Sequence, residues 1–342
     1  MKAMVLKQIS LVEKEPLEMT DFPVPNINSK EILVKVLACG VCHTELDEIE
    51  GRLHPKLPII LGHEIVGRVE KIGSQVTKFK KGDRVGIAWI HSSCGKCSFC
   101  RERRENLCAE FQATGCDANG GYAEFTAISE DFAYPIPERF SDSQAAPLLC
   151  AGAIGYRALR LSNLQDGQVL GLFGFGASAH IVIQVVKHKY PNSKVFVFTR
   201  PRQKEHQNLA ERLGADWVGA TGDIPPKKLD CAIDFTPAWR PIVHALRVLE
   251  KGGRVVINAI RKEERDKEFL LSLDYKEHLW LEKEIKSVAN ITREDAQDFL
   301  PLAAEIPILP KVQEFGLKAA NKALVLLKQG KIQGAGVLRI SN

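Results

Sequence analysis

A buried strand that runs directly into a glycine-rich loop and a helix is the feature of this sequence that most constrains its fold. The segment VLGLF (169–173) is continuously apolar, and GFGASA follows it with Gly174, Gly176 and Ala179 at G-x-G-x-x-A spacing. Between a strand and a helix, glycines permit a tight turn, and the first N–H groups of the helix can bind a phosphate. A glycine-rich turn without a ligand is the alternative. The flanking strand and helix favour a dinucleotide-binding unit.

The pattern around this unit predicts an α/β fold with a doubly wound parallel sheet. From about 152 to 292, the strands VLGLF, KVFVFT, LDCAIDF and RVVINAI are separated by helical stretches that run through Lys187, Leu213 and Leu249. Such alternation indicates βαβ units of the Rossmann type. The run 169–186 approaches the length of a membrane span, about 20 apolar residues. Glycine and polar residues interrupt it, so we expect a buried strand and helix and no membrane contact.

The remaining residues are strand-rich and form a second predicted domain. Residues 1–151 contain EILVKVLACGVC, IVGRVEKIG and GDRVGIAWI with turn signals between them, and the N-terminal segment alternates like a strand. Residues 293–342 hold the amphipathic helix AANKALVLLKQG and the strand GAGVLRI. We expect 293–342 to complete the domain of 1–151, with the dinucleotide-binding domain 152–292 inserted between them. Two domains suit 342 residues, which exceed what one core usually organises.

Charge and cysteine usage exclude several classes of function. The net charge of +5 comes from 47 basic and 42 acidic residues without a basic tail, which indicates a solvated surface and no nucleic-acid partner. The N-terminal segment lacks the apolar core of a signal peptide. Nine cysteines in such a chain point to reduced thiolates for metal or redox chemistry, and to a cytoplasmic location.

Four cysteines lie close together in the segment CGKCSFCRERRENLC. Cys94, Cys97, Cys100 and Cys108 can surround one tetrahedral ion, and an all-cysteine zinc site of this kind holds a loop (94–108) together. An iron–sulfur cluster is a poorer match, because the ferredoxin-type motif has its fourth cysteine after three intervening residues, followed by proline. A nucleic-acid zinc module is conceivable, but aromatic residues are not interleaved with its arginines.

A second set of potential metal ligands resembles the pattern of a known protein family. The segments are ACGVCHTELDEIEGR with Cys42, LGHEIVGRV with His63, and PLLCAG with Cys150. Together with the cysteine loop and GFGASA, in this order, they resemble the zinc-dependent medium-chain alcohol dehydrogenases over essentially the whole chain. The resemblance implies a GroES-like catalytic domain beside the Rossmann domain. It also implies that Cys42, His63 and Cys150 bind a catalytic zinc, which gives two zinc ions per chain.

The resemblance implies reversible hydride transfer between a primary or secondary alcohol and NAD(P) by a zinc-bound alkoxide mechanism. The expected partners are a small alcohol or aldehyde and further copies of the chain, in a homodimer or homotetramer. A polyol or threonine-type dehydrogenase on the same fold is the alternative. A zinc-stabilised binding protein without turnover is a further one.

Other site residues follow from the same resemblance. Thr44 is expected to accept the substrate proton, and Glu64 to tune the catalytic metal. Asp47 stands where relatives often carry a relay histidine, and an exposed carboxylate there would be ionised at neutral pH. His43 would approach the cofactor pyrophosphate, or else face solvent as an ordinary imidazole. The expected substrate pocket is lined by Ile49, Leu53 and Trp89.

The remaining cysteines have less specific interpretations. Cys39 and Cys42 spell C-x-x-C, which can be a redox pair. The resemblance leaves Cys39 as a packing residue. Cys116 and Cys231 are expected to be ordinary apolar side chains.

The end of the second Rossmann strand bears on the choice of cofactor. KVFVFT ends at Thr199, where an NAD enzyme usually places a carboxylate for the ribose 2′-hydroxyl. Arg200, Arg202 and Lys204 follow, and guanidinium groups suit a 2′-phosphate. We therefore expect NADP(H) in preference to NAD(H). Lys204 matches a cofactor-contacting lysine in some relatives, including NAD users, which keeps NAD(H) open. Ala335 stands where many relatives carry a cofactor-binding arginine.

Overall fold

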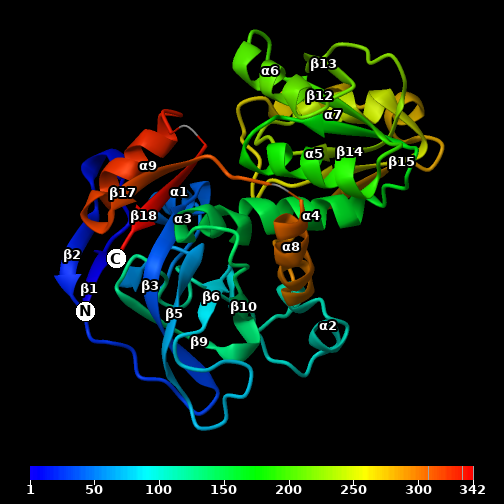
Figure 1. The fold of residues 1–342 in the computed structure, drawn as a ribbon. Helices are drawn as coiled ribbons and strands as arrows, with labels where there is room; N and C mark the ends of the chain where they lie inside the picture. The colour runs from blue at the N-terminus through cyan, green and yellow to red at the C-terminus, as the bar shows by residue number, and fades with distance from the viewer. Residues whose placement is uncertain (307, 333, 342) are drawn as a thin grey trace. The chain divides into compact units, whose positions relative to one another are not determined.

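The chain forms two compact units in a computed structural model, which describes residues 1–306, 308–332 and 334–341. The first unit comprises Met1–Cys150 and Ile291–Asn342, and the second comprises Ala151–Asn290 (Figure 1). The first unit is therefore made of two segments that are distant in sequence.

A seven-stranded sheet of order β10-β6-β5-β3-β18-β17, with β9 also paired to β3, organises the first unit. Its pairs are antiparallel except for β17 and β18, which run parallel. A three-stranded sheet of order β2-β1-β4 and the pair β7-β8 complete the strands. The bounds are β1 (Lys2–Leu6), β2 (Leu17–Asp21), β3 (Glu31–Val41), β4 (Ile59–Ile60), β5 (Ile65–Ile72), β6 (Arg84–Ile87), β7 (Ile90–Ser92), β8 (Gln112–Ala113), β9 (Phe125–Ser129), β10 (Ala133–Pro135), β17 (Val312–Gly316) and β18 (Ala335–Arg339).

Two predicted strands of this unit differ in detail from the expectation. The alternating N-terminal segment does form β1, but Ala3 to Leu6 are all buried, because β1 lies between β2 and β4 and packs into the core. GDRVGIAWI, expected as one strand, divides into β6 and β7, which belong to different sheets. Local alternation predicts strand formation, whereas the partner strands decide burial and continuity.

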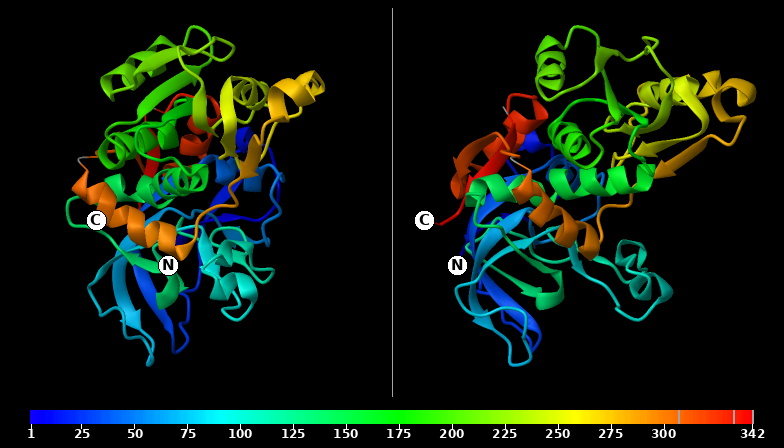
Figure 2. Two further views of the ribbon diagram at one scale, coloured as in Figure 1. Left: turned by 90° about the vertical axis from the view of Figure 1, so that its right-hand side faces the viewer. Right: turned by 45° about the vertical axis from the view of Figure 1, so that its right-hand side comes forward.

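The helices of the first unit are α1 (His43–Ile49), α2 (Ser98–Arg101), α3 (Asp142–Ala145), α8 (Arg293–Glu305) and α9 (Ala320–Lys328). α8 begins with a capping box, in which the hydroxyl of Thr292 accepts from Asp295 N and the Asp295 carboxylate accepts from Thr292 N. This helix begins beside the lobe that carries α2 (Figures 1 and 2). The C-terminal segment therefore packs against a loop from the N-terminal segment.

The second unit is a six-stranded parallel sheet of order β13-β12-β11-β14-β15-β16. Its strands are β11 (Val169–Phe173), β12 (Lys194–Thr199), β13 (Trp217–Ala220), β14 (Leu229–Asp234), β15 (Leu249–Ile257) and β16 (Glu284–Ser287), and its helices are α4 (Ala151–Ser162), α5 (Ala177–Lys189), α6 (Lys204–Arg212) and α7 (Arg240–Val248). The strand order reverses between β11 and β14, which is the switch point where doubly wound folds bind their ligands.

Apolar side chains cover both faces of the central strands β11, β12 and β14. Phe173, Phe196 and Phe198 form one core cluster with Ile242 and Leu246 of α7, and the rings of Phe173 and Phe198 stack at 4.2 Å. α4 packs against α5 and against β14 and β15. Since parallel strands are buried on both faces, their sequences are continuous apolar runs.

Several details of the second unit are absent from the prediction or differ from it. The short strands β13 and β16 were not expected, because neither is a long apolar run. The helix expected through Leu249 ends at Val248, and Leu249 begins β15. The run 169–186 is β11 followed by most of α5. Among the helices described, none is long and apolar enough to cross a bilayer.

Candidate metal and cofactor sites

Four side chains of the first unit bring potential metal ligands together. Cys42 precedes α1, His63 and Glu64 precede β5, and Cys150 ends the 3-10 helix Ala146–Leu149. Their ligand atoms all lie within 4.8 Å of one another, and the Sγ atoms of Cys42 and Cys150 are 4.0 Å apart. Thiolates about 2.3 Å from a tetrahedral zinc stand about 3.8 Å apart. The spacing therefore fits a single ion of that size.

Glu45 fixes the orientation of His63, and our sequence-based prediction did not include it. Its Oε1 lies 2.7 Å from His63 Nδ1, and its Oε2 accepts the Cys42 N–H at 2.7 Å as part of a capping box. Nε2 of His63 is buried and has no hydrogen-bond partner in the described chain. A histidine that binds a metal typically bonds a carboxylate through one ring nitrogen and faces the metal with the other. His63 has this arrangement, with its free nitrogen beside two sulfurs. The residues therefore fit a zinc ion.

The pKa shifts in the metal-free cluster show which protons a metal ion has to displace. The hydrogen bond with Cys150 lowers the pKa of Cys42 well below that of a free thiol, and the same contact raises the pKa of Cys150. Burial opposes a charge on His63, but Glu45 and Cys42 outweigh it and raise the pKa of the imidazole. Protons therefore compete with a metal at Cys150 and His63.

Glu64 reaches this cluster because Gly40 has no side chain. A Cβ at Gly40 would lie 1.8 Å from Glu64 Oε2. The Glu64 side chain is buried, and burial raises its pKa. Any larger residue at position 40 would displace this carboxylate from the cluster.

The structure places the predicted relay residues on α1. Thr44 Oγ1 accepts from Cys42 Sγ at 3.6 Å, and Thr44 is buried, whereas His43 is exposed. The expectation that Asp47 is an exposed carboxylate is wrong. Asp47 is 3% exposed, and Arg52 Nε donates to its Oδ1 at 2.5 Å. The chain turns back after α1, with Arg52 N donating to the Asp47 carbonyl, and this brings the guanidinium to the carboxylate.

The three predicted pocket residues fall into two groups. The Trp89 ring meets the His63 ring edge to face, with centroids 5.0 Å apart. Leu53 packs against the small cluster that contains Trp89 and Cys116. Ile49 is fully buried in the main core of the first unit. Only Trp89 and Leu53 therefore share one local environment.

Glu48 is a buried carboxyl group beside this cluster that the prediction also missed. It is 0% exposed, and neither carboxyl oxygen has a hydrogen-bond partner in the part of the chain that the structure describes. Burial raises its pKa well above the ordinary value. Burial, together with the charge of Glu48, raises the pKa of Cys116 to about 12. Cys116 is therefore an inert thiol, like the buried Cys39 and Cys231, and all nine cysteines are free.

The four cysteines of the loop 94–108 form the second cluster. Their sulfurs lie within 4.8 Å of one another, with 3.9 Å between Cys94 and Cys100. Backbone N–H groups point at the sulfurs: Cys97 N donates to Cys94 Sγ at 3.4 Å, and Glu110 N donates to Cys108 Sγ at 3.4 Å. The N–H groups of Lys96 and Cys97 lower the pKa of Cys94 to about 6. Four thiols in such a setting fit a closed zinc site.

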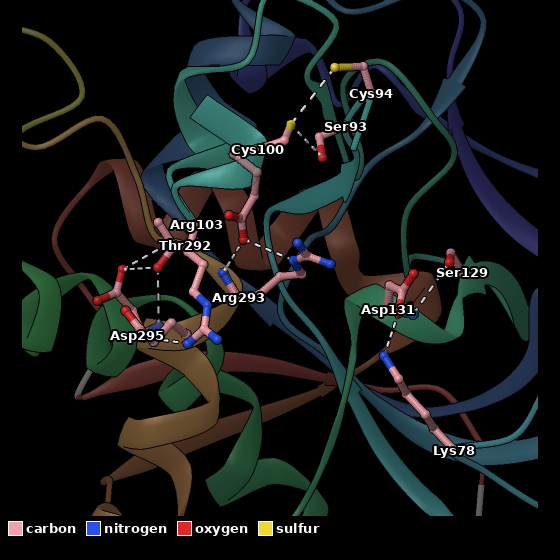
Figure 3. Close-up of polar contacts among 12 residues, drawn as sticks. Lys78, Ser93, Cys94, Cys100, Arg103, Ser129, Asp131, Thr292, Arg293 and Asp295 are labelled. Carbon is pink, nitrogen blue, oxygen red and sulfur yellow. Dashed lines mark hydrogen bonds and ion pairs between the residues drawn. The ribbon is translucent and has the colours of Figure 1, made fainter. Parts of the chain in front are cut away.

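Glu105 anchors this cysteine loop to α8. Glu105 is 1% exposed, and its Oε1 accepts from Arg293 N at 2.7 Å and from Arg293 Nε at 3.0 Å. The Arg293 guanidinium also lies over the Phe132 ring, 5.1 Å from its centroid. Figure 3 shows Arg293 with the Thr292–Asp295 cap on one side and Cys94, Ser93 and Cys100 on the other. The sequence could not reveal this contact, which joins positions 188 residues apart.

In the second unit, the glycine loop has the geometry expected of a dinucleotide motif. Gly174 has φ +83°, and a Cβ there would lie 2.8 Å from the Thr236 side chain, so both conformation and space call for glycine. A Cβ at Gly176, the N-cap of α5, would meet nothing within 4 Å. Ala179 is fully buried. The N-terminal turn of α5 thus has open space in front of it.

The residues after β12 differ in exposure. Arg200 and Lys204 are exposed. Thr199 is 1% exposed, and its hydroxyl donates to the Arg200 carbonyl at 3.1 Å and accepts from Gln207 Nε2 at 3.0 Å. The Thr199 hydroxyl is therefore already engaged inside the fold, and Arg200 is the better placed of the two to meet a ligand.

Comparisons with known proteins agree with this geometry. Residues 28–138 match the alcohol dehydrogenase GroES-like domain. Over 346 residues the chain is 42% identical to the "Probable alcohol dehydrogenase AdhA" of Mycobacterium tuberculosis, covering 99% of this chain and 97% of that protein. It is 33% identical over 355 residues to an alcohol dehydrogenase of Geobacillus stearothermophilus, covering 99% and 100%. The solved alcohol dehydrogenase of the archaeon Aeropyrum pernix superposes with a TM-score of 0.85 at 26% identity, covering 99% and 100%.

The fold and the sites define a GroES-like domain with an inserted dinucleotide-binding domain, as in the medium-chain dehydrogenase/reductase superfamily. Within that superfamily the chain belongs to the alcohol dehydrogenase family, whose members are NAD(P)-dependent oxidoreductases. The predicted fold class, family and class of activity are therefore confirmed.

Proposed function

We propose that this chain interconverts alcohols and aldehydes or ketones, with a zinc ion held by Cys42, His63 and Cys150. The observation that carries the proposal is the unpaired, buried Nε2 of His63 beside two sulfurs 4.0 Å apart. When bound, zinc supplies a Lewis acid for the substrate oxygen. Three protein ligands leave one position of a tetrahedral ion open to that oxygen.

The side chains around the cluster have separate roles in the proposed reaction. Glu45 holds the His63 ring in one tautomer, and Glu64 places a second carboxylate at the cluster. Thr44 Oγ1 would accept the hydroxyl proton of the substrate alcohol while its own hydroxyl proton passes on to the next acceptor. Asp47 follows one helical turn later on α1, and Arg52 orients its carboxylate as the next proton acceptor. Trp89 and Leu53 provide apolar surface for the carbon chain of the substrate.

We further propose a second zinc with a different role. The sulfurs of Cys94, Cys97, Cys100 and Cys108 offer four ligands and leave no open position, so this ion would stabilise the loop and take no part in turnover. Two zinc ions per chain follow from the two clusters.

The exposed Arg200 supports NADP(H) as the preferred cofactor. It follows the last residue of β12, where an acidic side chain would repel a 2′-phosphate and where this chain has Thr199. NAD(H) is the competing cofactor.

The edge strand β16 supports the prediction of a homodimer or homotetramer. β16 is the last strand of the sheet, and Ile285 on it is 45% exposed. Leu271 and Trp280 are 89% and 52% exposed on the segment that precedes it. An unpaired edge beside apolar side chains suits pairing with a second copy of the chain. The free thiols of all nine cysteines favour the cytoplasmic location that we predict.

Metal analysis combined with a substrate panel tests the proposed function. We expect two zinc ions per chain and reduction of simple aldehydes with NADPH. Cys42→Ser should retain one zinc and lose turnover while remaining folded. Activity on polyols or threonine alone would assign the chain to the alternative dehydrogenase class. Cofactor binding without turnover on any substrate would identify a binding protein, and Cys42→Ser with wild-type kcat would refute the ligand assignment.

A further inference from the structure

A buried lysine and a buried aspartate form an ion pair at the carboxyl end of the parallel sheet. Asp234 is the last residue of β14, and its side chain is 0% exposed. The Lys262 side chain, from the segment that follows β15, is 8% exposed, and its Nζ is paired with Asp234 Oδ2. Desolvation of two charges makes such a pair a poor source of stability. Its position therefore calls for another explanation.

Lys262 uses its three N–H donors on Asp234 and on the loop 235–239 that follows it. Besides Asp234, Nζ donates to the Thr236 carbonyl at 2.8 Å and to the Ala238 carbonyl at 2.9 Å. The other oxygen of Asp234 accepts from the Thr236 hydroxyl at 2.8 Å and from its N–H at 3.2 Å. Glu263 N, next to Lys262, donates to the Pro237 carbonyl at 2.7 Å. The loop 235–239 is thus folded around the ammonium group.

This loop is in contact with the glycine loop of the dinucleotide motif. A Cβ built on Gly174 would lie 2.8 Å from Thr236 Cγ2 and 3.7 Å from Phe235 Cβ. β11 and β14, which lead into the two loops, are hydrogen-bonded neighbours, and the strand order reverses between them. Dinucleotides bind at the switch point of a doubly wound sheet. The loop 235–239 and the glycine loop therefore shape the same site.

We propose that Lys262 is a positioning residue for the dinucleotide, because it holds the loop 235–239 against Gly174 and so keeps the cofactor site in its binding conformation. The proposal rests on the proposed function, since it takes the site to be a dinucleotide site. Lys262 acts through the loop and does not touch the cofactor: its three donors are engaged and its side chain is buried.

Loss of Lys262 removes the only ammonium donor from the Thr236 and Ala238 carbonyl groups and leaves Asp234 without its counter-ion. The loop then keeps only the bonds from Glu263 N to the Pro237 carbonyl and from Trp239 N to Asp266 as links to the segment after β15, and its middle samples other conformations. If only a fraction of the molecules has the binding conformation, the apparent dissociation constant equals the intrinsic one divided by that fraction. Because the loop contacts the turn that serves the common pyrophosphate, NADH and NADPH should be affected alike.

The test compares Lys262→Met with the double variant Asp234→Asn/Lys262→Met, each in the full-length zinc-loaded protein. Dissociation constants for NADH and NADPH are measured by nicotinamide fluorescence, together with kcat, the KM of the alcohol, zinc content and the melting temperature. Lys187→Met is the matched control, because Lys187 on α5 pairs with Asp216 at 2.7 Å in the same unit but not with the loop.

We expect Lys262→Met to raise both dissociation constants at least about tenfold, with the KM of the alcohol and the zinc content unchanged. The double variant separates positioning from general stability. Removing the unpaired charge should restore its melting temperature towards wild type, but its dinucleotide affinity should stay weak because the loop bonds are still missing. The control should bind both cofactors normally.

Three results would overturn the inference. Lys262→Met with wild-type affinity would show that the loop does not depend on the lysine. Recovery of affinity together with melting temperature in the double variant would reduce Lys262 to a structural role. A loss confined to NADPH would indicate direct contact with the 2′-phosphate. If Lys262→Met does not fold, the dinucleotide affinity of the double variant alone decides whether Lys262 is a positioning residue. A wild-type protein that binds neither dinucleotide would instead refute the proposed function.

Discussion

Glu45 Oε1 lies 2.7 Å from Nδ1 of His63, and both side chains are buried, so the metal-facing nitrogen of the histidine is oriented from behind by a carboxylate. The same carboxylate accepts the N–H of Cys42 and therefore positions two of the proposed zinc ligands at once.

Replacement of Glu45 by alanine should weaken zinc binding at the catalytic cluster by about 10- to 100-fold, because the ring of His63 and the N-terminus of α1 both lose their acceptor. Competition with a chromogenic chelator measures the affinity. Glu18→Ala, which removes an exposed carboxylate paired with Lys7, is the control. Wild-type affinity in Glu45→Ala would contradict the positioning role of this residue.

The two zinc ions should leave the protein in a fixed order on acidification. Each cluster holds one thiol with a lowered pKa, Cys42 or Cys94, and one with a raised pKa, Cys150 or Cys97. The catalytic cluster also contains His63, whose pKa is raised, and offers three ligands where the loop offers four sulfurs, so protons should displace its zinc first. Turnover should therefore disappear after release of the first zinc, before the loop metal is lost. Stepwise dialysis with metal analysis and activity at each pH follows both events. Loss of the loop zinc first would contradict this order.

Glu48→Met should stabilise the protein, because an unpaired carboxyl in an apolar setting is replaced by a side chain of similar length. The expected gain is about 1 to 3 kcal/mol at alkaline pH. The pKa of Glu48 is raised in the folded state, so the cost of its ionisation is absent below the ordinary value of 4.5 and grows as the pH rises from that value towards the folded-state pKa. The difference in melting temperature between variant and wild type should grow from pH 5.5 to 8.5. A difference that is independent of pH would show that the pKa of Glu48 is the same in the folded and the unfolded protein, and would contradict this prediction.

Arg200→Ala should weaken NADP(H) binding by about ten- to a hundredfold, the loss of one charge-assisted bond of roughly 1.5 to 3 kcal/mol, and should leave NAD(H) almost unchanged. The measurement is kcat/KM for both cofactors. Arg212→Ala, an exposed arginine at the end of α6, is the matched control. Thr199→Asp should reverse the preference, and because Thr199 is buried we also expect it to lower the melting temperature. A wild type that prefers NAD(H), with no effect of Arg200→Ala, would assign this loop to NAD(H).

Much of the fold could be predicted because its signals are local. The continuous apolar run of VLGLF, the glycines after it and the helix beyond specify a buried parallel strand and its turn without reference to the rest of the chain. The candidate metal ligands could be named for a different reason, since they lie in short segments that resemble a known family.

What could not be predicted depends on residues that are distant in sequence. The partner of Glu105 is Arg293, and the partner of Asp234 is Lys262. Nothing in the local pattern of an acidic residue tells whether it faces solvent or a buried cation, which is also why the burial of Asp47 was missed. Glu45 is the exception, because a glutamate three residues after the N-cap of a helix is a readable capping signal.

The position of β18 has a consequence for how the protein is made. β18 pairs with the segment Ala38–Val41 of β3, immediately before the ligand Cys42, but it is translated about 300 residues later. At 5–20 residues per second, the ribosome needs about 15 to 60 s to cover that distance. During this interval the nascent chain exposes an open strand edge next to the proposed ligand Cys42, and open strand edges are surfaces on which growing polypeptides associate. The yield of active protein should therefore depend on chaperones that cover this edge until β18 leaves the ribosome.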